Sequence, residues 1–149
     1  MPIDNSNMLK VIEDFSHQCR MALELPKGMS VSGKVDKIVV AGMGGSAVGG
    51  DLLKSYMRSS KIPVFVVRDY DVPHFVNEKT LLFAVSYSGN TDETLSAFED
   101  ASRKKANIVA VTSGGQLGAI AKKVVKIPGG LQPRAALGYL FFSGLGRFD

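Results

Sequence analysis

The residues from 37 to 50 read KIVVAGMGGSAVGG, a short apolar run that passes directly into a glycine-rich turn. Such a run bounded by glycine is typical of a buried strand, and glycine allows the backbone to turn tightly and to approach a ligand closely. A helix can begin within the turn, at about Ala47. The stretch therefore predicts a strand, a turn and a helix, which is the repeating unit of α/β folds.

Four further apolar runs follow along the chain. They are continuous rather than alternating, which is typical of strands that helices cover on both faces. The five predicted strands span residues 37–41, 64–67, 81–85, 107–111 and 124–127. The predicted helices that follow them span residues 47–57, 91–105, 117–122 and 133–142. The fold class predicted is α/β: a doubly wound, five-stranded parallel sheet flanked by helices, of the flavodoxin-like type.

Apolar helices are also predicted at the two ends of the chain. Apolar residues recur at three- and four-residue spacings from Met8 to Leu23, which predicts one amphipathic helix. The last helix is apolar from Ala135 to Phe142, so we expect a partner subunit or a further part of the protein to cover it. We predict a helix and connection over residues 1–35 and one domain over residues 36–149.

The composition narrows the class of protein. Eighteen Lys and Arg against fourteen Asp and Glu give a net charge of +4, with no concentrated basic stripe, so we expect small anionic ligands and no nucleic acid. The single cysteine, Cys19, excludes an internal disulfide and suits the cytoplasm. We expect no membrane association, because no apolar run approaches the ~18 residues of a membrane span.

Ligands of open parallel sheets bind at the carboxyl ends of the strands, so the residues after each predicted strand are the candidates. Gly44, Gly45 and Ser46 follow the first strand, where backbone amides at the start of a helix attract an anion. Two other interpretations stay open. The glycines can serve packing alone, or they can belong to a dinucleotide fingerprint with Arg68 at its ribose end.

The third predicted strand is followed by SYSGNTDET at residues 86–94. Ser86, Ser88 and Thr91 bring three hydroxyls to a helix N-terminus, and hydroxyl donors, amide donors and the helix dipole together suit a phosphate monoester. The alternative is an ordinary helix cap, formed by Asn90 or Thr91 with Glu93 closing a capping box.

Two later strand ends add to this polar edge. Residues 112–115 read TSGG, a shorter version of the same chemistry. Arg134 follows Pro133 in the first turn of the last predicted helix, where the helix dipole disfavours a cation unless an anion offsets it. Arg134 is therefore either a surface residue or a cation aimed at the ligand. We predict no metal site, because His17, His74 and Cys19 lie far apart in the sequence.

These four segments together resemble the sugar isomerase (SIS) domain, and more closely the first half of the bifunctional phosphoglucose/phosphomannose isomerase family. The resemblance covers about residues 36–142. It implies an aldose–ketose isomerase that interconverts glucose 6-phosphate or mannose 6-phosphate with fructose 6-phosphate. It also implies a homodimer that binds a hexose 6-phosphate and needs no cofactor.

The resemblance also implies roles for matching residues. Gly44, Gly45 and Ser46 would line the sugar, and Ser86, Ser88 and Thr91 would hold the phosphate. Arg134 would be catalytic, because a cation placed beside the enediolate stabilises charge that develops only along the reaction.

The sequence departs from the family in one respect. The family's catalytic glutamate and ring-opening histidine lie in its second half, and neither His17 nor His74 matches that histidine. We therefore expect this chain to bind sugar phosphates weakly and to turn them over poorly. Two competing functions are a non-catalytic SIS module that senses a phosphosugar and an NADP-binding oxidoreductase. The second gives no role to the three clustered hydroxyls.

Overall fold

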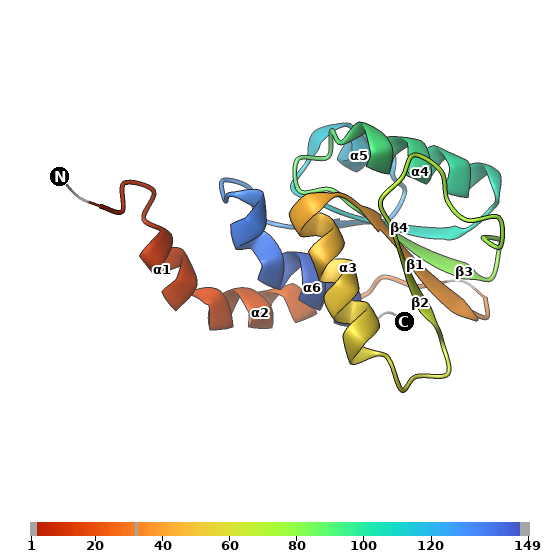
Figure 1. Ribbon diagram of the computed structural model, residues 1–149, viewed down its shortest axis with the longest axis horizontal. Helices are drawn as coiled ribbons and strands as arrows, with labels where there is room; N and C mark the ends of the chain where they lie inside the picture. Colours follow the sequence, from red (N-terminus) through yellow and green to blue (C-terminus); the bar gives the residue numbers. More distant parts are fainter. Residues whose placement is uncertain (1–2, 32, 147–149) are drawn as a thin grey trace.

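Five parallel strands form the sheet of this protein in a computed structural model that describes residues 3–31 and 33–146 (Figure 1). The strand order is β2-β1-β3-β4-β5. The strands are β1 (Lys37–Gly42), β2 (Val64–Val67), β3 (Thr80–Val85), β4 (Asn107–Thr112) and β5 (Val124–Lys126). All four neighbouring pairs are parallel, which confirms the predicted fold class.

Helices cover both faces of the sheet (Figure 1). One face carries α3 (Gly44–Tyr56) and α6 (Leu137–Leu145), and the other carries α4 (Asp92–Arg103) and α5 (Gly115–Ile120). Successive strand residues point to opposite faces, so Val40 belongs to the core under α3 and α6, whereas Val39 belongs to the core under α4 and α5. A 3₁₀ turn, η1 (Pro133–Ala136), leads directly into α6.

The prediction of a single N-terminal helix is wrong. The chain forms α1 (Met8–Glu13) and α2 (Phe15–Glu24), which meet at Asp14. The apolar stripe also points away from the core, with Leu9 63% and Ile12 67% exposed, while Gln18 is buried. The reason is tertiary: α2 packs against α6 through the face that carries Gln18 rather than through the most apolar face.

The expectation for the last helix is also corrected, because other helices of the same chain cover α6. It packs between α2 and α3, and its residues Tyr139 and Leu140 are buried. A Cβ at Gly49 of α3 would lie 3.0 Å from the Leu140 carbonyl oxygen, so the glycine permits close approach of the two helices. No helix of the described residues is long and apolar enough to cross a membrane.

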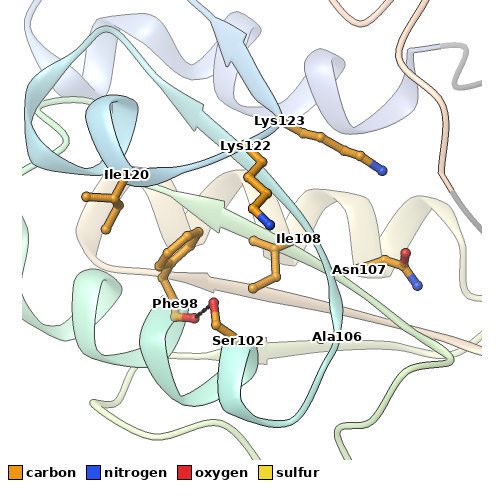
Figure 2. A pocket seen from close by; sticks show the side chains of 8 residues that line it. All are labelled: Phe98, Ser102, Ala106, Asn107, Ile108, Ile120, Lys122 and Lys123. Atoms are coloured by element: carbon orange, nitrogen blue, oxygen red, sulfur yellow. Dashed lines mark hydrogen bonds between the residues drawn. The ribbon is translucent and has the colours of Figure 1, made fainter.

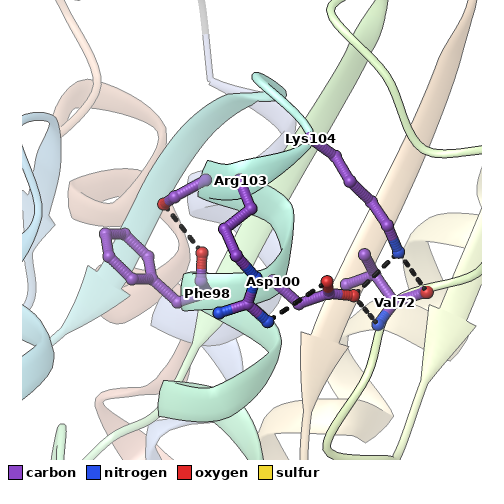
Figure 3. A network of polar contacts seen from close by, with 6 residues as sticks. Val72, Phe98, Asp100, Arg103 and Lys104 are labelled. Atoms are coloured by element: carbon purple, nitrogen blue, oxygen red, sulfur yellow. Dashed lines mark hydrogen bonds and ion pairs between the residues drawn. The ribbon is translucent and has the colours of Figure 1, made fainter.

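A charged cluster anchors the long connection between β2 and β3 to α4 (Figure 3). The Asp100 carboxylate accepts hydrogen bonds from the Val72 amide at 3.1 Å and from Lys104 Nζ at 2.8 Å. Lys104 Nζ also donates to the Val72 carbonyl oxygen at 3.0 Å. The hydrogen bond from Lys104 is the main cause that holds the pKa of Asp100 below its ordinary value.

Candidate functional site

The glycine turn and the serine-rich loop lie together at the point where the strand order reverses. β1 pairs with β2 on one side and with β3 on the other, and the register places Gly42 beside Val85. The backbones meet so closely that a Cβ at Gly42 would lie 2.8 Å from the Val85 carbonyl oxygen. The carboxyl edge at such a switch point is where doubly wound sheets bind their ligands.

The glycine turn opens α3. Gly44 is its first residue and has a φ of 50°, which favours glycine. The amides of Gly44 and Gly45 belong to the first turn, where backbone N–H groups lack acceptors within the helix. Ser46 is mostly buried, with 7% of its surface exposed. The turn therefore offers amides to a ligand more readily than the Ser46 hydroxyl.

The serine-rich loop is held by its own hydroxyls. Ser86 is buried, its Oγ accepts the Gly89 amide at 3.0 Å, and it shares one hydrogen with Thr91 Oγ1 at 2.9 Å. The two hydroxyls carry two hydrogens and use one between them, so one O–H remains for an acceptor. Ser88 is exposed and only accepts, from the Asn90 amide at 3.2 Å.

The interpretation of the Thr91 hydroxyl as an ordinary helix cap is wrong. Thr91 occupies the N-cap position of α4, but it makes no side-chain cap hydrogen bond and pairs with Ser86 instead. The first-turn amides of α4 are therefore not satisfied by the Thr91 hydroxyl. Asp92 and Glu93 lie in that turn and complement the helix dipole.

The serine-rich loop and the end of β4 form one connected unit. Gly89 has a φ of 74°, and a Cβ there would lie 1.9 Å from the Gly114 carbonyl oxygen. The Asn90 side chain accepts the Gln116 amide at 2.9 Å, and the Gly89 carbonyl accepts the Leu117 amide at 2.9 Å. Two hydroxyl-rich strand ends are thus fixed against each other.

Tyr87 links this unit to the segment after β5, a role that sequence reasoning missed. Its hydroxyl donates to the Pro128 carbonyl oxygen at 3.0 Å and accepts the Leu131 amide at 2.8 Å. A tyrosine between two serines at a strand end was the available signal. The link holds the segment that leads to Arg134.

The structure brings Arg134 to the glycine turn. A Cβ at Gly45 would lie 3.5 Å from the Arg134 Cα, so η1 packs directly against the first turn of α3. Arg134 is exposed, and no ion pair found among residues 3–31 and 33–146 involves it. An anionic ligand bound at the glycine turn would therefore lie near Arg134.

Lys126 is a second cation near this edge that the sequence analysis did not single out. It ends β5, and its Nζ lies 3.4 Å from where a Cβ at Gly114 would stand. Lys126 lies within the strand predicted over residues 124–127, so a search of the residues after each predicted strand passes over it. The TSGG segment thus has a positive charge beside it.

Other residues raised by the sequence lie elsewhere. Arg68 pairs with Asp51 of α3, so its guanidinium is already engaged. His17 lines a pocket with Asp14 and Tyr139, and His74 lies in the connection after β2. In the part of the chain that the structure describes, no three His, Cys, Asp or Glu side chains are placed to hold a metal ion.

A cavity of about 380 Å³ lies at the opposite edge of the sheet (Figure 2). It is lined by Phe98, Ile108 and Ile120 together with Lys122, and it borders the amino end of β4. The Ser102 hydroxyl at its rim donates to the Phe98 carbonyl oxygen at 2.8 Å. This cavity is separate from the strand ends that carry the clustered hydroxyls.

Comparison with known proteins finds a matching family model and similar sequences. The SIS domain family model matches residues 33–129. A bifunctional phosphoglucose/phosphomannose isomerase of Caldicellulosiruptor bescii is 50% identical over 142 residues, which cover 90% of this chain and 42% of the relative. The enzyme of that name from Thermoplasma acidophilum is 55% identical over 109 residues, which cover 73% of this chain and 34% of the relative.

A solved structure shares the fold. A hypothetical protein from Thermus thermophilus aligns with a TM-score of 0.70 at 24% identity, over 97% of this chain and 40% of that one. The chain thus spans less than half the length of the curated relatives and of this structure.

Proposed function

The chain belongs to the SIS domain family, and from this premise we propose that it is the substrate-binding half of a hexose 6-phosphate aldose–ketose isomerase. The reaction is the interconversion of glucose 6-phosphate or mannose 6-phosphate with fructose 6-phosphate. Relatives that are 50% and 55% identical carry the name of such an isomerase, which supports the assignment. Within the proposal, residues 36–149 form the SIS domain of a cytoplasmic homodimer, and residues 1–35 form its N-terminal helices and connection.

The observation that carries the proposal is the placement of three hydroxyls at the N-terminus of α4. Ser88 is exposed, and the pair of Ser86 and Thr91 retains one free O–H. Charge-assisted hydrogen bonds from such groups contribute about 1.5–3 kcal/mol each. The helix dipole adds to the attraction for a doubly charged phosphate.

The sugar then extends toward the glycine turn. Gly44 and Gly45 present amides there, and Ser46 lies beneath them. Arg134 stands beside the same turn. Removal of the proton next to the carbonyl leaves an enediolate, and the Arg134 cation stabilises the negative charge on its oxygens before the proton returns to the neighbouring carbon. This chain's part is therefore binding and charge stabilisation.

The test compares two ligands that share a phosphate. Fructose 6-phosphate represents the substrate, and arabinonate 5-phosphate carries a carboxylate where the enediolate would be. Calorimetry should show tighter binding of the arabinonate by about tenfold or more, because complementarity to the reacting state favours the charged analogue. Arg134→Ala should remove most of this preference, whereas Arg58→Ala, an exposed arginine elsewhere, should leave it intact.

Equal binding of both ligands by the unmodified chain would contradict the isomerase assignment. It would favour the alternative, a non-catalytic SIS module that captures a phosphosugar, because capture alone needs no complementarity to an enediolate. Absence of binding to either ligand would refute both.

A further inference from the structure

Gln18 of α2 is a buried polar side chain whose amide nitrogen and amide oxygen both bond to residues far along the sequence. Its exposed fraction is 5%. Its Nε2 donates to the Ala135 carbonyl oxygen at 3.0 Å, and its Oε1 accepts the Tyr139 amide at 3.3 Å. One side chain of α2 therefore makes two hydrogen bonds to the backbone 117 and 121 residues away.

These two backbone groups flank a junction between helix types. The chain forms a 3₁₀ turn over Pro133–Ala136, and α6 begins at Leu137. Ala135 and Tyr139 are four residues apart, the spacing that one continuous α-helix would join by a direct hydrogen bond. Gln18 bonds to both members of that pair, so its carboxamide takes the place of the direct hydrogen bond between the Tyr139 amide and the Ala135 carbonyl oxygen.

The junction has no local cap. Ala136 is the N-cap residue of α6 and offers no side-chain hydrogen bond. Tyr139 is the third residue of α6, where the amide normally depends on an N-cap side chain. Gln18 supplies that acceptor from another helix. The Tyr139 amide is buried, so leaving it without an acceptor would be costly.

Gly138 makes room for this arrangement. A Cβ at Gly138 would lie 2.4 Å from Gln18 Oε1 and 2.9 Å from its Cδ. The α6 surface is therefore hollowed at the point where the Gln18 side chain enters.

We propose that Gln18 is a positioning residue for Arg134. Arg134 immediately precedes Ala135, whose carbonyl Gln18 holds, and η1 packs against Gly45 at the glycine turn. A 3₁₀ turn has 3.0 residues per turn and an α-helix 3.6, so extending α6 back through Ala135 would turn Arg134 to another direction. Gln18 maintains the 3₁₀ turn and with it the direction of the arginine.

The proposal rests on the proposed function, and its test uses the same two ligands. Gln18→Leu keeps the approximate size and loses both hydrogen bonds. We expect it to reduce the preference for arabinonate 5-phosphate over fructose 6-phosphate by about fivefold or more, with less than about a twofold change in the affinity for fructose 6-phosphate. In the Arg134→Ala background it should change the preference no further, because the two residues act through one group.

A matched control separates positioning from lost stability. Val39→Ala creates a core defect in β1 on the face of the sheet opposite α6, and it should lower stability without changing the preference. An unchanged preference in Gln18→Leu, with the Arg134→Ala effect present, would overturn the positioning role and leave the proposed function standing. Loss of the Arg134→Ala effect itself would overturn the proposed function.

A conservative variant gives a second readout within one protein. Protonated Gln18→Glu can donate to Ala135 and accept from Tyr139, whereas its carboxylate can only accept. The titratable groups that line the same pocket, Asp14, His17 and Tyr139, are present in both proteins. Burial raises the pKa of a carboxyl group above its ordinary value of about 4.3, so relative to the unmodified chain at each pH the preference of the variant should recover as the pH falls through the pKa of the introduced carboxyl, which an NMR titration of the variant measures. A deficit that stays constant across that measured pKa would contradict the proposal.

Discussion

The Ser86–Thr91 loop and the Pro133–Ala136 turn face the same candidate site, but different parts of the chain hold them in place. The loop is fixed by its own hydroxyls and by the neighbouring strand end, as in the bond between Ser86 and the Gly89 amide. The turn itself is bonded by Gln18, which comes from a helix at the other end of the sequence, and Tyr87 of the loop holds only the segment before the turn. The phosphate side is thus locally determined, and the arginine side depends on a remote helix.

This difference predicts which substitutions should affect each half of the candidate site. A change at a loop group that also makes internal hydrogen bonds, such as the Ser86 hydroxyl, should act on ligand binding and on folding together. A change in α2 should reach Arg134 without touching the phosphate. The following predictions separate these behaviours, beginning with the largest effect.

Gly89→Ala should have the largest effect on stability among substitutions in the serine-rich loop. The residue has a φ of 74°, and the new Cβ would meet the Gly114 carbonyl oxygen. We expect a loss of about 3–5 kcal/mol in the free energy of unfolding, measured by urea titration. The control is Gly28→Ala, where φ is 79° but nothing lies within 4 Å of the added Cβ, so only the backbone penalty of about 1–2 kcal/mol should appear. Equal losses would show that the contact between the two strand ends does not matter.

Replacing Ser86 and Ser88 separately should distinguish the loop's part in stability from its part in ligand binding. Ser86→Ala leaves the buried Gly89 amide without its acceptor, so both stability and the affinity for fructose 6-phosphate should fall, the former by about 1–2 kcal/mol. Ser88→Ala removes an exposed hydroxyl and should weaken binding with little loss of stability.

Calorimetry of the folded double variant should show a loss of about 2 kcal/mol or more in binding. Ser102→Ala, a serine at the opposite edge of the sheet, is the control that should bind normally. Unchanged affinity in the double variant would remove the phosphate from this loop.

Asp100 provides a remote anchor of the same kind as Gln18, but one that depends on charge. Its pKa is lowered in the folded protein, so its contribution to stability is present above the ordinary carboxylate pKa and is lost as the pH falls below about 4. Asp100→Asn should cost about 1 kcal/mol near neutral pH, and this difference should shrink as the pH falls. Urea titrations at several pH values test it, with Glu99→Gln, an exposed neighbour, as the control. A difference that does not vary with pH would exclude the ionised form as the cause.

Much of the fold was predictable because its signals are local. Continuous apolar runs predicted the parallel strands, and placing candidates directly after those runs located the groups that meet at one edge. The three hydroxyls of the serine-rich loop were found in the same way, since they lie within six residues of one another.

The predictions that were wrong concern which helix face packs against which other part of the chain. The periodic stripe of Leu9 and Ile12 predicted the buried face of one helix, yet the buried face carries Gln18. Periodicity reports which side chains are apolar but not which neighbouring surface is shaped to receive them. The pocket that receives Gln18 exists because of Gly138, more than a hundred residues later. The same limit explains why α6 was expected to be uncovered although α2 and α3 enclose it.

The strand order also sets a length scale. Neighbouring strands lie roughly 5 Å apart, so the ends of β1 and β4, with β3 between them, are separated by roughly 10 Å. Inorganic phosphate spans only one of these two intervals, whereas a molecule that contacts both the amides of Gly44 and the TSGG segment must reach across both. The spacing between the strands therefore sets the minimum length of a ligand that contacts both the Gly44 amide and the TSGG segment.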